Sequence, residues 1–174
     1  MNALAEKMLL GALAGFAATL PMTSAMSRMH RRLPPQERYP LPPRELSENL
    51  PNFGMRISTT TLLHHFLYGA ASGALFAVVS RRRNAAAGGI YGAAVWTASY
   101  LGWIPASGIL RIATRHPSRR NRLMLAAHLV WGASLAIGLR ELERAELASF
   151  SRTTAPNGHL EDRKDEAQRA PSIG

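Results

Sequence analysis

Residues 57–80 read ISTTTLLHHFLYGAASGALFAVVS, a run of 24 residues without a single Asp, Glu, Lys or Arg. An amphipathic helix of a soluble protein carries polar and charged side chains along its solvent-facing side. As a helix, a run of this length is roughly 36 Å long, whereas the hydrocarbon core of a bilayer is roughly 30 Å thick. The stretch therefore predicts a helix that crosses a membrane.

Three further runs have the same property, at 8–27, 84–110 and 123–139. The four runs make up about half of the chain, and all 21 Lys and Arg and all 11 Asp and Glu lie in the other half. The mean hydropathy of −0.08, an ordinary value for a soluble protein, averages over these two halves. Because Pro105 ends the third span, we expect membrane-spanning helices at about 8–27, 57–80, 85–104 and 123–140.

The predicted fold class is all-α, an integral membrane four-helix bundle in residues 1–150. Residues 151–174 mix both signs of charge with very few large aliphatic side chains, which predicts a disordered tail. A cleaved signal peptide is the alternative for the first run. Only Lys7 precedes that run while three arginines follow it, so we favour an uncleaved helix.

The formal net charge is +10, and the chain has no cysteine. The missing thiols exclude disulfide frameworks and Cys-ligated metal sites. A basic protein is a candidate for nucleic-acid binding, but here the arginines gather at the ends of the uncharged runs, where guanidinium groups bind lipid phosphates. The expected partner is the lipid bilayer, and no nucleic-acid surface is expected.

Two of the runs share a six-residue sequence motif, which we call the histidine phrase. His65-Phe-Leu-Tyr-Gly-Ala70 matches His128-Leu-Val-Trp-Gly-Ala133, and the pair Gly11/Gly15 of the first run matches Gly88/Gly92 of the third more weakly. Each matching unit contains two spans, so the two copies run in the same direction. The sequence therefore predicts a duplicated helical hairpin.

Glycines spaced four apart let two membrane helices approach closely. Packing inside one bundle and a homodimer surface are both served by such spacing, and we favour packing inside one bundle. A second copy of the chain, or another membrane protein, remains a candidate partner. The predicted helix-packing residues are Gly11, Gly15, Gly69, Gly73, Gly88, Gly92 and Gly132.

Polar groups inside membrane helices are functional candidates. His65 and His128 occupy matching places in the two phrases, and no Asp or Glu lies in any of the four runs. The alternatives are a cofactor or ligand site, haem or another metal between two imidazoles, and a hydrogen-bonding role within the bundle or toward headgroups. Two histidines without a carboxylate are a weak metal signal, so we favour the hydrogen-bonding role, with no catalytic residue, metal or cofactor.

Three segments resemble a known family: Ala14-Gly-Phe-Ala-Ala-Thr-Leu-Pro-Met-Thr23, Pro40-Leu-Pro-Pro-Arg-Glu45 and the two histidine phrases. Over roughly residues 8–140 they resemble small bacterial inner-membrane proteins of the YagU type. The resemblance implies a multi-pass protein of the inner membrane and no particular reaction or ligand. We expect a non-enzymatic accessory or structural protein, with envelope stress as one setting, and a ligand-binding or transport module as the alternative.

Orientation follows the counts of Lys and Arg in the short loops. Connectors 28–56 and 105–122 carry six and five arginines and lie on one side of a four-span bundle, against seven Lys and Arg near the spans on the other side. This balance favours both termini outside. The Arg81–Arg83 hairpin argues for the opposite orientation.

Overall fold

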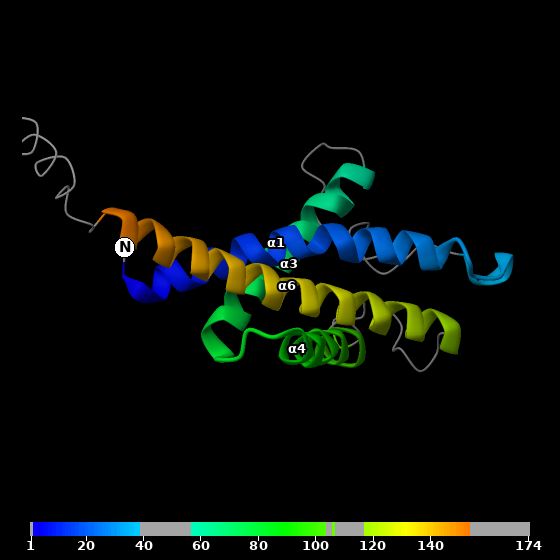
Figure 1. Cartoon of the computed structure of the whole chain (residues 1–174). Coiled ribbons are helices and arrows are strands. Elements are labelled where there is room, and N and C mark those ends of the chain that lie inside the picture. The colour runs from blue at the N-terminus through cyan, green and yellow to red at the C-terminus, as the bar shows by residue number, and fades with distance from the viewer. Residues whose placement is uncertain (1, 39–56, 104–105, 107–116, 154–174) are drawn as a thin grey trace, which may run out of the picture. The chain divides into compact units, whose positions relative to one another are not determined.

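The computed structural model describes residues 2–38, 57–103, 106 and 117–153 (Figure 1). Its regular elements in these residues are all helical, with no strand, as the sequence predicted. They are α1 (Ala3–His30), the 3-10 turn η1 (Pro35–Glu37), α3 (Ile57–Val79), α4 (Ala85–Thr97), the π-helical η2 (Ala98–Trp103) and α6 (Ser118–Thr153).

Helix α1 has clear start and stop signals. The Asn2 side chain accepts a hydrogen bond from the Ala5 N–H at 2.8 Å and so caps the first turn. Glu6 lies in that turn, and Arg28 and His30 lie in the last one, which suits the helix dipole at both ends. The helix is longer at each end than the predicted span of 8–27.

Pro21 lies inside α1, and the helix continues on both sides of it. A proline frees the carbonyl four residues before itself, here at position 17, and the sequence predicts a hydrogen bond to it from Thr19 or Thr23, the two hydroxyls beside Pro21. Instead, Thr19 Oγ1 donates to the Gly15 carbonyl at 2.9 Å, and Thr23 Oγ1 donates to the Thr19 carbonyl at 2.7 Å. A hydroxyl on a helix bonds its own i−4 carbonyl most easily, so neither threonine reaches position 17.

The turn between α3 and α4 is organised by Arg83 and Asn84. Arg83 Nη2 donates to the Ala77 carbonyl at 3.0 Å, Nη1 donates to the Ser80 carbonyl, and the guanidinium carbon lies 5.6 Å from the centre of the Phe76 ring. Asn84 then caps α4 by accepting from the Ala87 N–H at 2.8 Å. One carbonyl near the end of α3 and one amide in the first turn of α4 are therefore bonded by side chains of this turn.

The predicted third span, 85–104, differs most from the structure. The α-helix α4 has only 13 residues, about 20 Å at 1.5 Å per residue. The next six residues form η2, and Gly102 within η2 has non-helical backbone angles (φ −109°, ψ −107°). In the sequence Pro105 follows, and its ring clashes with an α-helical carbonyl at position 101. By length and composition, three helices of the described chain can cross a membrane: α1, α3 and α6.

Helix α6 continues beyond the predicted span of 123–140 at both ends. The chain forms two compact units, Met1–Leu142 and Glu143–Gly174, so α6 begins in the first unit and ends in the second. Residues 151–153 of the predicted disordered tail are the last turn of α6. The rest of that tail lies outside the described residues. Segments 44–50 and 109–115, which the sequence predicts to be short helices on the membrane surface, lie outside them as well.

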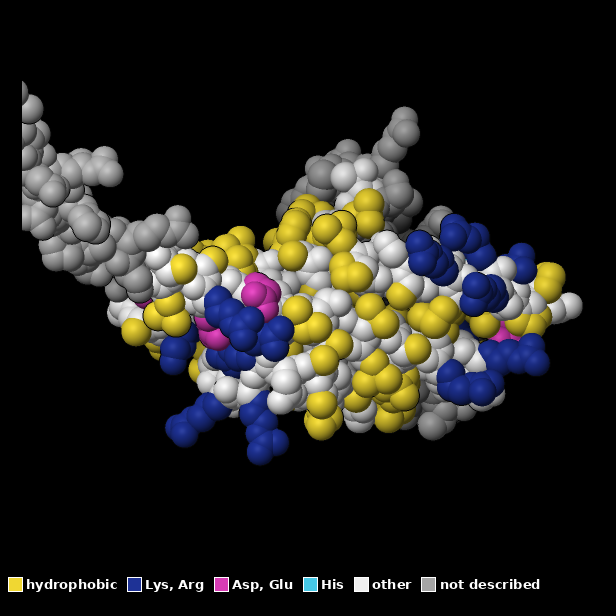
Figure 2. Space-filling model, viewed as in Figure 1, with side chains coloured by type: hydrophobic (Ala, Val, Ile, Leu, Met, Phe, Trp, Pro, Cys, Tyr) yellow, Lys and Arg dark blue, Asp and Glu magenta, His cyan; other side chains and the backbone are white. Residues whose placement is uncertain are grey.

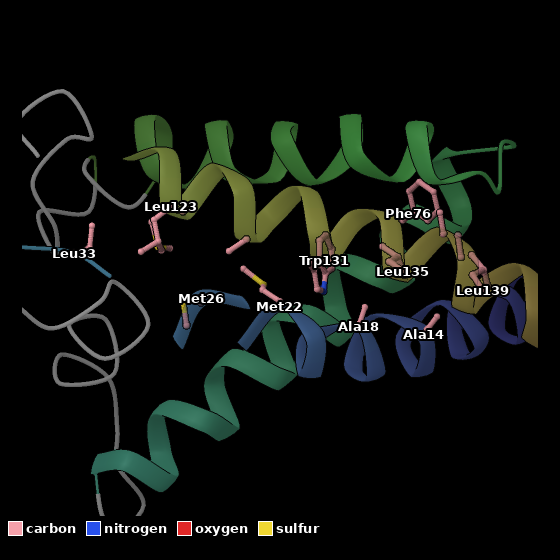
Figure 3. Packing of buried hydrophobic residues seen from close by; sticks show 14 residues of the cluster. Ala14, Ala18, Met22, Met26, Leu33, Phe76, Leu123, Trp131, Leu135 and Leu139 are labelled. Carbon is pink, nitrogen blue, oxygen red and sulfur yellow. The ribbon is translucent and has the colours of Figure 1, made fainter. Parts of the chain in front are cut away.

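The core of the first unit lies where α1 and α6 face each other, with Phe76 of α3 added from one side (Figure 3). Ala14, Ala18 and Met22 of α1 meet Trp131, Leu135 and Leu139 of α6, at 0–5% exposure. On each helix these positions recur every three or four residues, so they form one stripe. The opposite faces carry exposed leucine, valine and phenylalanine side chains.

Candidate functional site

The first glycine contact joins α1 and α3. A Cβ atom at Gly11 would lie 2.5 Å from the carbonyl oxygen of Gly73, and a Cβ at Gly15 would meet the Gly69 carbonyl and lie 2.8 Å from the Gly73 Cα. Real Cβ atoms are essentially never found so close. The two backbones therefore touch directly, and the rising order on α1 against the falling order on α3 makes the helices antiparallel. We call this contact the first seam.

The second seam joins α4 and α6. A Cβ at Gly88 would meet the Gly132 carbonyl and lie 2.7 Å from the Ala136 Cβ, and a Cβ at Gly92 would meet the His128 carbonyl. These helices are antiparallel as well. All seven glycines that the sequence singled out for helix packing thus lie at close contacts within a single chain.

The two seams differ in register by one helical turn. Gly69 and Gly132 hold the same place in the matching phrases, and the sequence match pairs Gly15 with Gly92. In the structure Gly15 lies against Gly69, whereas Gly88 lies against Gly132. Glycines spaced by four residues present the same face at every turn, so a sequence match between them cannot fix the turn.

Aromatic side chains connect the two helix pairs. Trp131 of α6 donates from Nε1 to the Gly15 carbonyl of α1 at 3.2 Å. Tyr68, which holds the matching place in α3, has its hydroxyl hydrogen-bonded to Ser99 Oγ of η2 at 2.7 Å. In each phrase, then, the aromatic residue bonds to the opposite helix pair.

A third aromatic hydrogen bond and a row of rings reinforce this connection. The Tyr91 hydroxyl of α4 donates to the Ser72 carbonyl of α3 at 2.8 Å. The Tyr91 ring lies between Phe76 and Trp131, with centroid distances of 4.9 and 6.1 Å. Three helices, α3, α4 and α6, therefore share one row of rings, which suits tilted aromatic packing.

The histidines of the two phrases lie on α3 and α6, His65 on the first and His128 on the second. His128 Nδ1 lies 2.8 Å from the Met124 carbonyl, and because a carbonyl can only accept, Nδ1 carries the hydrogen. His128 Nε2 is then the nitrogen with a lone pair. The His65 ring meets the Phe66 ring edge-on, at a centroid distance of 6.4 Å.

Groups of three or more His, Cys, Asp or Glu side chains that could hold a metal ion are absent from residues 2–38, 57–103 and 117–153. A pair of imidazoles alone fills too few positions for the four-coordinate sites that zinc prefers. What the two histidines and the neighbouring hydroxyls and rings can do chemically is donate and accept hydrogen bonds between helices.

One residue that the sequence did not single out is Arg120. It lies in the first turn of α6 with no exposed surface, and its Nη1 donates to the Glu37 carbonyl at 3.5 Å. We grouped it with the other arginines that flank the spans. The sequence could have predicted this burial from helical spacing. Arg120 lies four residues before Met124, on the same side of α6 as the buried Met124, Ala127 and Trp131.

Comparisons with protein-family models, with curated proteins and with solved structures give no match for this chain.

Proposed function

We propose that this chain is a multi-pass membrane protein with a non-enzymatic, accessory or structural role. One observation carries the proposal: glycines and alanines fill the closest contacts between helices, while many large apolar side chains are exposed. Glycines fill the seams, while Leu13, Leu67 and Ile90 are 52%, 53% and 73% exposed. In water such leucines and isoleucines belong in the core. In lipid, helices gain from close backbone contact, and exposed aliphatic side chains cost nothing.

The distribution of charge supports the same proposal. In Figure 2 the Lys and Arg side chains gather at both ends of the first unit, with a band of hydrophobic side chains between them. Guanidinium groups at two levels separated by an apolar band match the two headgroup layers of a bilayer. The inner membrane of a bacterium is the location proposed from the YagU-type resemblance, and α4 with η2 is the proposed fourth span.

The duplicated hairpin is part of this proposal. Two facts support it: α1 and α4 both run antiparallel to α6, and the phrase aromatics Trp131 and Tyr68 each bond to the other helix pair. Two hairpins related by rotation about an axis along the membrane normal give this arrangement. Each copy supplies one seam, and the aromatic bonds hold the copies together.

The membrane proposal is tested by extracting membranes of expressing bacteria with alkaline carbonate, which releases peripheral proteins. We expect the chain to stay in the pellet and to enter solution only with detergent. A soluble enzyme and a known multi-pass protein of the same cells serve as controls. Release of the chain by carbonate alone would overturn the proposal.

The orientation needs a separate experiment, for which we propose both termini outside. Reporter fusions at the C-terminus, one active only in the periplasm and one only in the cytoplasm, distinguish the two orientations. We expect the periplasmic reporter to be active. A cytoplasmic C-terminus would show that the Arg81–Arg83 hairpin outweighs the eleven arginines of the two longer connectors.

A binding or transport module is the second candidate, and the defined orientation of the His128 ring favours it. With Nδ1 bonded to Met124, the His128 ring is oriented as a ligating imidazole often is. The absorbance spectrum of detergent-purified protein incubated with haemin is the test. Haem binding is supported if the wild-type protein gives the Soret band of bound haem and both His65→Gln and His128→Gln lose it. It is rejected if the wild-type protein leaves the spectrum of free haemin unchanged.

A further inference from the structure

The two ends of the first unit use their arginines differently. At the end where α1 stops and α6 starts, six arginines are exposed. Arg38 donates to the Leu33 carbonyl at 2.6 Å, and the other five are Arg28, Arg31, Arg32, Arg119 and Arg122. We call these five residues the basic face. Arg31 and Arg32 follow Arg28 by three and four positions, and Arg122 follows Arg119 by three. Residues at these spacings lie on one side of a helix, so each set projects from one side of its helix end.

The chain after α1 is folded onto the first turn of α6, which places the two sets at the same end. Leu33 is 6% exposed and belongs to the same core cluster as Leu123 and Met124, and Figure 3 shows Leu33 and Leu123 at one end of that core. Two positions before Arg122, the buried Arg120 donates to the Glu37 carbonyl. A buried arginine and a buried leucine therefore hold segment 31–38 beside the start of α6.

The charges of the basic face are not neutralised inside the part of the chain that the structure describes. None of its five guanidinium groups makes a hydrogen bond or an ion pair there. At the opposite end Lys7, Arg81 and Arg82 are exposed as well, whereas Arg83 is bonded to the carbonyls of Ala77 and Ser80, and Arg140 is paired with Glu141 at 3.1 Å. Glu37, the one acidic side chain of segment 31–38, is half-buried.

We propose that the basic face binds the headgroups of anionic phospholipids at the membrane surface, an inference that rests on the proposed membrane function. A guanidinium group matches the two oxygens of a phosphodiester with a pair of parallel hydrogen bonds. The exposed apolar sides of α1 and α6 adjoin the basic face and offer a place for the acyl chains (Figure 2). A zwitterionic headgroup carries its own ammonium, which opposes the five positive charges.

The experiment measures the thermal unfolding midpoint of the full chain in neutral detergent as phospholipid is added. Phosphatidylglycerol is compared with phosphatidylcholine and with inorganic phosphate at equal concentration. We expect phosphatidylglycerol alone to raise the midpoint. Each arginine at a membrane surface contributes about a fivefold change in affinity, so Arg31→Gln/Arg122→Gln weakens phosphatidylglycerol binding by about 25-fold.

The matched control is Arg81→Gln/Arg82→Gln, which removes two exposed arginines at the opposite end. Because these two lie outside the basic face, we expect them to weaken phosphatidylglycerol binding less than Arg31→Gln/Arg122→Gln does. A second pair in the basic face, Arg28→Gln/Arg119→Gln, repeats the first test with different residues. Equal effects of phosphatidylcholine, equal effects of inorganic phosphate, or equal losses in the control pair would each overturn the proposal. Carbonate extraction of the same variants separates this proposal from the membrane proposal. If the chain stays in the membrane pellet but shows no preference for phosphatidylglycerol, only the proposed lipid binding by the basic face is contradicted.

Discussion

The two glycine seams solve the same packing problem with different residues. In the first seam, Gly11 and Gly15 of α1 meet Gly69 and Gly73 of α3, so glycine stands on both sides at two successive turns. In the second, Gly88 meets Gly132, but one turn along α6 the residue is Ala136, which holds the place of Gly73. Each seam also holds one methyl group, because a Cβ at Gly11 would lie 2.6 Å from the Ala77 Cβ, and a Cβ at Gly88 would lie 2.7 Å from the Ala136 Cβ. The seams differ one turn away, where Gly15 meets the Gly69 carbonyl in the first seam and Gly92 meets the His128 carbonyl in the second.

This difference shows which contacts set the distance between the helices. A Cβ at Gly69 would meet the Thr19 hydroxyl, and a Cβ at Gly132 would meet the Gly88 carbonyl, so neither position has room for a side chain. Ala77 and Ala136 are both buried, and each faces a glycine across its seam. Close approach therefore needs glycine at one turn of each seam, and the next turn depends on the local register.

The largest expected effect is the loss of a seam. Gly69→Leu and Gly132→Leu put a branched side chain where a Cβ already meets an oxygen atom, so the helices must separate. We expect each to lower the free energy of unfolding by about 1–3 kcal/mol, the usual cost of overpacking. Unfolding in detergent, followed by circular dichroism, measures it. If only Gly69→Leu were destabilising, the two seams would not be equivalent.

A smaller change separates glycine from alanine. Gly73→Ala copies Ala136 into the first seam, where the new Cβ would lie 2.7 Å from the Gly15 Cα. We expect a loss of about 1 kcal/mol or more. The control is Gly89→Ala, whose Cβ would meet only Leu129, at 3.8 Å, and which we expect to be neutral. Equal stability of the two variants would mean that the first seam accepts a methyl group at this position, as the second does.

The aromatic bonds between the helix pairs come next. Trp131→Phe removes a buried donor to the Gly15 carbonyl, and Tyr68→Phe removes a bond to Ser99 from a side chain that is 41% exposed. Each hydrogen bond is worth about 0.5–1.5 kcal/mol, with the buried one at the upper end. We expect Trp131→Phe to lower the unfolding midpoint more than Tyr68→Phe does. The reverse order would place the main connection at Tyr68.

The smallest expected effect belongs to the histidines. His128→Gln keeps a donor that can reach the Met124 carbonyl, so we expect a change in unfolding free energy of about 0.5 kcal/mol or less. The same melting experiment measures it beside Gly132→Leu, one turn away. A loss from His128→Gln larger than that from Gly132→Leu would contradict the hydrogen-bonding role and favour a bound ligand.

The sequence by itself determined the helical class and the position of most helices. Runs without charge can be solvated only by lipid or by other apolar surface, so their lengths locate α1, α3 and α6. The same argument failed for the third run, 84–110. Amino-acid composition predicts an apolar segment but not where its α-helical backbone ends. Here α4 ends early because the π-helical η2, with the irregular Gly102, follows it.

Only the tertiary structure decided which glycine meets which and which arginine is buried. A spacing of four residues predicts which face of a helix makes the contact but not which turn. The glycine that Gly15 contacts could therefore not be predicted from the sequence. Arg119, Arg120 and Arg122 are the same residue type in the same stretch of sequence. Of these three, only Arg120 is buried, and it donates to the Glu37 carbonyl. Such choices depend on the rotation of one helix against another, which is set by contacts between residues far apart in the chain.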